Sequence, residues 1–134
     1  MKRRHLIGVY TLAVGLLVFS GGIAHNLVRL PELGSAVAAG EMSPRFAGEQ
    51  VVETFFAGAA MNVLGLLVMM LSLELRKGTR AAWRAVLVIG VFYLLFGLVA
   101  FFYRYPNLHL LGFAVTGALL CWPLVLWRKD FVAE

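Results

Sequence analysis

Apolar residues gather into four long runs along this chain, and charged residues, prolines and glycines concentrate between them. The runs cover residues 6–30, 51–75, 81–103 and 108–127. An α-helix rises about 1.5 Å per residue and the hydrocarbon layer of a bilayer is about 30 Å thick, so about 20 residues are enough to cross it. Each run reaches that length without the strict alternation typical of a strand. The pattern predicts an all-α membrane protein with four transmembrane helices in a single domain, residues 1–134.

Composition supports this interpretation. Of 134 residues, 61% are hydrophobic and 14% are charged, and the mean hydropathy is +0.85. A water-soluble domain needs a more polar surface than this composition provides. The first run follows three basic residues and could also be a secretory signal with a cleavage site at residues 20–22. Its apolar stretch continues to Leu30, however, which favours an uncleaved anchor.

The basic residues are distributed unequally between the two ends of the runs. Three of them, Arg29, Arg45 and Arg104, flank one set of ends. Nine flank the opposite ends: Lys2, Arg3, Arg4, Arg76, Lys77, Arg80, Arg84, Arg128 and Lys129. Basic residues stay predominantly on the cytoplasmic side. The distribution therefore predicts an up-down-up-down bundle in a plasma (inner) membrane with both termini cytoplasmic, and it explains the net charge of +5 without a nucleic-acid partner.

The connections between the predicted helices differ in length. Residues 31–49 contain two prolines and three glycines and are predicted to form a long outer loop, either a plain connector or a lid that begins with a short helix at Pro31. The inner connection and the second outer turn are short, which makes sequential helices antiparallel neighbours. This outline is similar to that of DoxX-like proteins and of the sterol-isomerase type of four-helix membrane domain. The similarity is one of outline alone, so it assigns no role to any residue.

Small residues recur at helical spacing on the predicted helices, as is typical of helices that pack closely in lipid. Asn62 is predicted near the middle of the bilayer, where an unpaired amide costs on the order of several kcal/mol, so we expect it to hydrogen-bond to a neighbouring helix. A second copy of the chain could also take up this surface, so a homo-oligomer is an open alternative. The predicted helix-packing residues are Gly58, Asn62, Gly65, Gly90, Gly97 and Gly112.

Six ionisable residues are predicted to lie together at the extracytoplasmic end of the bundle. His25 and Arg29 are one helical turn apart, as are Glu49 and Glu53. Charged groups at membrane depth usually face the bundle interior and take partners there. We therefore expect Glu53 to pair with Arg29 or Arg104 and a histidine to join them. This set is called the outer polar cap: His25, Arg29, Glu49, Glu53, Arg104 and His109.

The outer polar cap could simply hold the helices in register, or it could line a binding pocket. The leading hypothesis is a small integral membrane protein, with no assigned catalytic residues, that binds a lipid, a quinone or a partner membrane protein through the cap. The alternative is an enzyme acting on a membrane-embedded lipid or isoprenoid substrate, with Glu53 and either His25 or His109 as acid and base.

Two further functions have weaker support in the sequence. Haem could be held by His25 and His109, but each histidine stands alone on its helix. A small-solute carrier usually has an ionisable residue near the middle of the bilayer, and Asn62 and Tyr93 do not titrate usefully at neutral pH. No spacing typical of a metal site occurs, so no metal and no other cofactor is expected.

Overall fold

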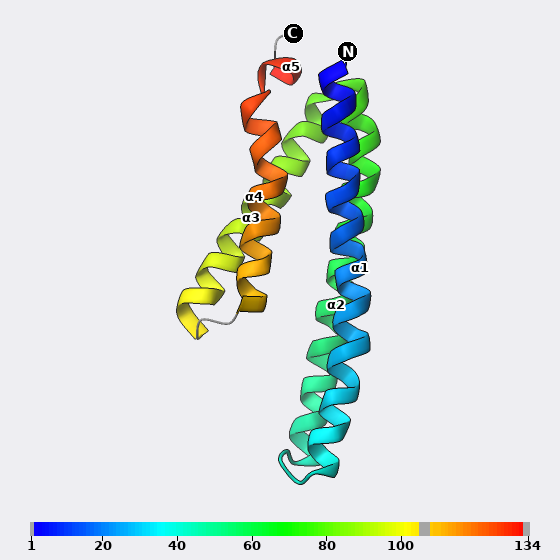
Figure 1. The fold of residues 1–134 in the computed structure, drawn as a ribbon, viewed down its shortest axis with the longest axis vertical. Coiled ribbons are helices and arrows are strands. Elements are labelled where there is room, and N and C mark those ends of the chain that lie inside the picture. The colour runs from blue at the N-terminus through cyan, green and yellow to red at the C-terminus, as the bar shows by residue number, and fades with distance from the viewer. Residues whose placement is uncertain (1, 105–107, 133–134) are drawn as a thin grey trace. The chain divides into compact units, whose positions relative to one another are not determined.

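The computed structural model describes residues 2–104 and 108–132, without the side chains of residues 104, 108, 109 and 132. The regular structure in these residues is helical throughout, which confirms the predicted all-α membrane fold. The helices, traced in Figure 1, are α1 (Lys2–Ala38), α2 (Pro44–Lys77), α3 (Arg80–Arg104), α4 (Leu108–Leu126) and α5 (Lys129–Val132). Three of them, α1, α2 and α3, are long and apolar enough to cross a membrane, and α4 is apolar but shorter.

The long outer loop predicted for residues 31–49 is wrong. α1 continues to Ala38 and α2 begins at Pro44, so residues 39–43 alone connect them. The prediction took Pro31 as a helix boundary, but this residue lies inside α1. Proline removes one backbone donor, and here the leucines and alanines on either side of it favour helix. The hydroxyl of Ser35 donates to the Pro31 carbonyl at 3.1 Å.

A compact turn joins α1 to α2. Gly40 has φ +75°, a left-handed conformation that glycine adopts without steric cost. The N–H of Glu41 donates to the carbonyl of Ala36 at 2.9 Å, which is the characteristic bond of a Schellman motif at a helix end. Ser43 then caps α2, since its Oγ accepts the N–H of Phe46 at 3.3 Å. Local sequence signals therefore end both long helices, and the short segment between them is enough to connect them.

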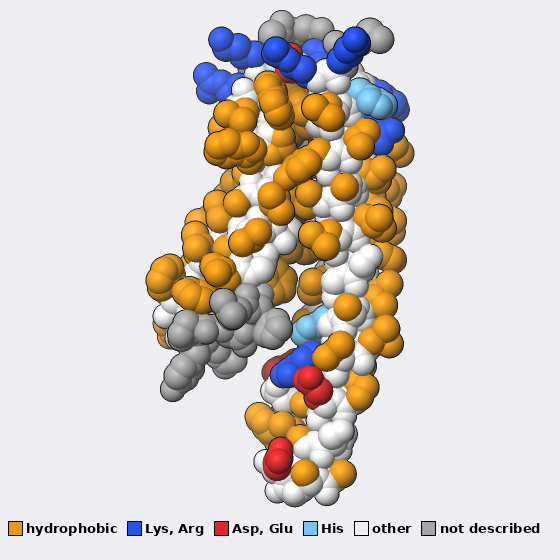
Figure 2. Space-filling model, viewed as in Figure 1, with side chains coloured by type: hydrophobic (Ala, Val, Ile, Leu, Met, Phe, Trp, Pro, Cys, Tyr) orange, Lys and Arg blue, Asp and Glu red, His pale blue; other side chains and the backbone are white. Residues whose placement is uncertain are grey.

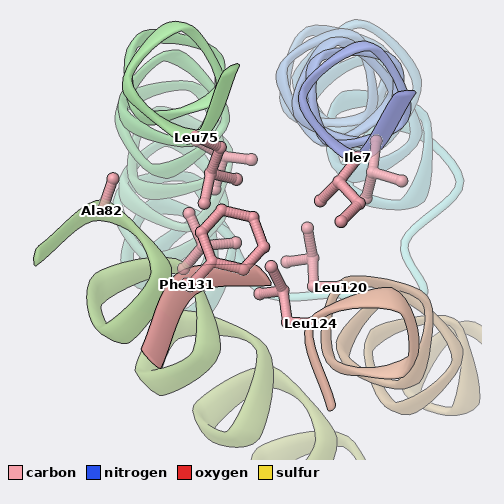
Figure 3. Packing of buried hydrophobic residues seen from close by; sticks show 9 residues of the cluster. Ile7, Leu75, Ala82, Leu120, Leu124 and Phe131 are labelled. Carbon is pink, nitrogen blue, oxygen red and sulfur yellow. The ribbon is translucent and has the colours of Figure 1, made fainter. Parts of the chain in front are cut away.

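The chain divides into two compact units, and each is described by itself. The first comprises residues 1–14 and 68–134. In this unit the side chains of Ile7, Leu75 and Phe131 point toward one another, together with those of Leu120 and Leu124 (Figure 3). We call this cluster the basal core: Ile7, Val14, Val68, Leu75, Ala82, Val86, Leu120, Leu124 and Phe131.

Polar contacts reinforce the first unit around the basal core. The indole Nε1 of Trp83 donates to the Leu124 carbonyl at 3.0 Å, and Arg80 Nε donates to the Phe131 carbonyl at 3.1 Å. These bonds satisfy carbonyls in and after the last turn of α4, where intrahelical donors run out. They therefore tie α3 to α4 and α5.

The second unit comprises residues 15–67, which are the remainder of α1, the turn, and the first two thirds of α2. The two helices run antiparallel and side by side, and the turn between them is drawn in cyan in Figure 1. Leu33 and Ala47 are buried close to the turn. The second unit carries most of the residues singled out from the sequence as a site.

Candidate functional site

A five-residue pattern, Gly-x-Ala-x-Asn, occurs once in each helix of the second unit, at residues 22–26 of α1 and 58–62 of α2. The two copies face each other. A Cβ built on Gly58 would collide with the side-chain amide of Asn26, and a Cβ built on Gly22 would collide with Oδ1 of Asn62. Each asparagine therefore lies over the glycine of the other helix. We call these four residues the Gly/Asn lock.

The same register continues along both helices beyond the Gly/Asn lock. A Cβ on Gly65 would lie 2.5 Å from the backbone nitrogen of Phe19 and 2.8 Å from the carbonyl oxygen of Gly15. The obstacle at Gly65 is backbone, which cannot turn aside as a side chain can. The two helices thus approach as closely as helices do in small-residue interfaces in lipid.

The amides of the Gly/Asn lock are not satisfied within the described residues. The Oδ1 atoms of Asn26 and Asn62 are buried and have no hydrogen-bond partner there. Asn62 thus contacts the neighbouring helix, as expected, but through packing on Gly22 and not through the hydrogen bond that the sequence analysis predicted. A buried acceptor without a donor costs about 1–3 kcal/mol. The lock therefore contributes close packing and register.

Two members of the outer polar cap take partners on their own helices. Arg29 Nη1 lies 2.5 Å from Glu32 Oε2, and Gln50 Nε2 donates to Glu53 Oε2 at 3.0 Å. Both pairs are spaced i, i+3, so each partner is one turn away on the same helix. Arg29 pairs with Glu32 and not with Glu53, and the alternative pair of Glu53 with Arg104 stays a prediction because the Arg104 side chain lies outside the described residues. The side chains of Arg29 and Glu32 are both more than half exposed, and such pairs contribute little to stability.

The other members of the outer polar cap are only partly described. His25 is half-buried and directly precedes Asn26 of the Gly/Asn lock. Glu49 lies 3.8 Å from Arg45 at the start of α2, and both are exposed. The side chains of Arg104 and His109 lie outside the described residues. Convergence of the whole cap, haem ligation by the two histidines and acid–base chemistry at Glu53 therefore stay predictions.

α3 and α4 of the first unit pack through small residues, although not through all those expected. A Cβ on Gly97 would meet the backbone of Ala114, and a Cβ on Gly90 would lie 2.7 Å from a cysteine sulfur of α4. Gly112 instead faces open space. Gly117 takes the close position on α4, because the face of α4 that carries Ala114 is turned roughly opposite to Gly112.

Reasoning from the sequence did not single out Asn26 as a packing residue. The signal was present, since "GIAHN" and "GAAMN" share glycine, alanine and asparagine at the same spacing. Identical small and polar residues at i and i+4 on two antiparallel neighbours can face each other reciprocally. The repeat would have predicted the Gly/Asn lock once the two helices were taken as neighbours.

Neither a metal cluster nor a known relative indicates the activity. Within residues 2–104 and 108–132, no three histidine, cysteine, aspartate or glutamate side chains are grouped as metal ligands. The chain matches no protein-family model, no curated protein and no solved structure.

Proposed function

We propose that this membrane protein crosses the inner membrane four times, with both termini in the cytoplasm, and binds a partner membrane protein through the outer end of its α1–α2 hairpin. The three long apolar helices support a membrane location, and α4 supplies the fourth span in this proposal. The orientation is supported by the nine basic residues that flank one set of helix ends.

The α1–α2 hairpin is longer than a bilayer requires. α1 has 37 residues and α2 has 34, which correspond to about 56 Å and about 51 Å of helix. The hydrocarbon layer is about 30 Å thick, and tilting a helix absorbs only part of such an excess. Basic residues at Lys2 and Lys77 hold one end of each helix at the cytoplasmic surface in the proposed orientation. The excess length then lies on the outer side.

The helical segments that extend beyond the membrane begin next to Arg29 in α1 and Glu53 in α2. α1 continues for nine residues past Arg29 (30–38), and α2 begins nine residues before Glu53 (44–52). Nine residues of helix extend about 13 Å. We call residues 30–52 the hairpin tip, and we place it in the aqueous layer outside the membrane, with Arg29 and Glu53 of the outer polar cap at its base.

The observation that carries the proposal is the apolar surface of this hairpin tip. Phe46 is 50% exposed and Val52 is 54% exposed, and Val51 beside it is also exposed. Large apolar side chains are ordinary on a surface that faces lipid, but several of them exposed to water on one short helical segment favour a protein partner that covers them. Their place beyond Glu53 therefore favours a protein partner over acyl chains.

The charges of the hairpin tip indicate the character of the partner. The tip contains one basic residue, Arg45, and three acidic ones: Glu32, Glu41 and Glu49. Complementary charge steers association and fixes register more than it raises affinity. The partner surface is therefore expected to be apolar with a basic rim.

Site-specific photo-crosslinking in intact membranes tests the proposal. A photoreactive residue at Phe46 or Val52 is expected to give a discrete protein adduct. The matched control is Val63, also exposed on α2 but ten residues inward from Glu53, where lipid adducts are expected. Lipid adducts at all three positions, with no protein adduct at Phe46 or Val52, would overturn the proposal.

A further inference from the structure

An open groove of about 540 Å³ runs along the first turns of α1 in the first unit. Its described lining residues are Lys2, His5, Leu6 and Val9. Their spacing places them on one face of the helix. Two polar side chains come first and two aliphatic ones follow, which is the order of a head group and an acyl chain in a phospholipid.

The apolar part of this groove lies on the outer surface of the first unit. Leu6 is 62% exposed and Val9 is 42% exposed. Ile7, on another face of the same helix, is buried in the basal core. The basal core thus fixes the rotation of α1 about its axis, and that rotation turns the groove away from the packed interior.

The polar end of the groove lies in a region rich in positive charge. Figure 2 shows lysine and arginine side chains gathered at the end of the first unit that carries the N-terminus. Among its described residues the first unit has two carboxylates, Glu74 and Asp130. The Glu74 carboxylate already has partners, because it accepts hydrogen bonds from Lys77 Nζ at 2.6 Å and from Thr79 Oγ1 at 3.2 Å. No described carboxylate forms an ion pair with Lys2.

Two neighbouring arginines, Arg4 and Arg76, are packed against glycines, whereas the side chains of Lys2 and His5 are exposed. The guanidinium of Arg4 lies against Gly78, and the side-chain stem of Arg76 lies against Gly8. Lys2 and His5 are exposed at the mouth of the groove. Lys2 and His5 are thus free to meet an incoming anion at the point where the apolar surface begins.

We infer that this groove binds one anionic phospholipid, with the phosphate at Lys2 and His5 and an acyl chain along Leu6 and Val9. Basic residues beside a membrane span attract acidic lipids electrostatically, and buried methylene groups add to the binding. The inference depends on the first unit alone. It is independent of any partner at the hairpin tip.

Native mass spectrometry of the purified full chain, titrated with phosphatidylglycerol or with phosphatidylcholine of the same acyl chains, tests the inference. We expect one phosphatidylglycerol to be retained and phosphatidylcholine to bind at least about tenfold more weakly. The variant Lys2→Ala/His5→Ala is expected to lose about tenfold in affinity for phosphatidylglycerol. Both residues are exposed, so the fold is expected to persist, and circular dichroism checks this.

The matched control is Arg128→Ala/Lys129→Ala, which removes two exposed cations of the same region away from the groove. A change of less than about twofold is expected there, because the contact is local. Equal losses in the two variants, or equal affinity for the two lipids, would overturn the inference. Displacement of the lipid by millimolar inorganic phosphate would overturn it as well, since the apolar wall would then contribute nothing.

Discussion

Asn26 and Gly58 illustrate what single residues decide in this protein. The amide of Asn26 occupies the space where a Cβ of Gly58 would lie, and Asn62 does the same at Gly22, one turn away. Neither amide oxygen has a partner among the described residues, so shape complementarity and not hydrogen bonding is the contribution that the Gly/Asn lock makes. Interactions of this kind are coupled, because changing one member alters the space available to the other.

A double-mutant cycle tests this coupling. Gly58→Ala alone is expected to destabilise the fold, because its methyl group would collide with the Asn26 amide. Asn26→Ala in the same chain removes the obstacle, so the double variant is expected to be more stable than the sum of the single effects by about 1 kcal/mol or more. Unfolding monitored by circular dichroism in detergent measures the four free energies. Effects that add to within about 0.5 kcal/mol would mean that the two residues are not in contact.

Gly65 permits a direct comparison within one helix. Gly65→Ala places a methyl group 2.5 Å from the Phe19 nitrogen, so the helices must separate, at an expected cost of about 1–3 kcal/mol. Gly48→Ala is the control, since a Cβ there meets nothing within 4 Å and alanine favours helix by up to about 1 kcal/mol. We expect thermal unfolding to show a lowered Tm for the first variant and an unchanged or raised Tm for the second. An equal change of Tm in both variants would contradict the close approach of α1 and α2 at Gly65.

At the scale of elements, the lengths of α1 and α2 are the main departure from expectation. The apolar runs end near Leu30 and begin near Val51, yet the helices extend to Ala38 and from Pro44. Local signals set these ends: the left-handed Gly40 stops α1, and the Ser43 hydroxyl caps α2. Hydropathy locates the part of a helix that lies in lipid only to within about a turn, and capping locates the end of the helix.

Hydrogen exchange followed by mass spectrometry tests the helix ends. Amides of residues 32–41 and 48–52 are expected to be protected, and those of residues 42 and 43 to exchange rapidly. The substitution Ser43→Ala is expected to accelerate exchange in the first turn of α2 and to cost about 1 kcal/mol. Uniformly fast exchange across residues 31–49 in the unmodified protein would favour the long loop that the sequence suggested.

At the scale of the whole molecule, the asymmetry of charge is the property with the widest consequences. Lysine and arginine outnumber aspartate and glutamate, twelve to seven, and nine of the twelve flank one set of helix ends. This excess sets the proposed orientation. It also leaves the hairpin tip mildly acidic and the groove of α1 in a basic region.

Cysteine accessibility tests the orientation. In a Cys121→Ala background, a cysteine at Ser43 is expected to react with a membrane-impermeant maleimide in intact cells, because the turn lies outside. A cysteine at Lys129 is expected to react only after the membrane is opened. Both side chains are exposed, so a difference in labelling reports the side of the membrane and not burial. The reverse pattern would invert the topology and place the hairpin tip in the cytoplasm.

The sequence by itself determined the membrane environment, the helical class and the approximate positions of the long apolar helices, because a slab of hydrocarbon demands such helices whatever their neighbours are. Tertiary structure decided the contacts: that Gly117 and not Gly112 faces α3, that Asn26 lies over Gly58, and that Arg29 takes Glu32. These depend on how far each helix is rotated about its axis and on which partner a side chain reaches first. Both are set by packing against neighbours, which hydropathy along one chain does not encode.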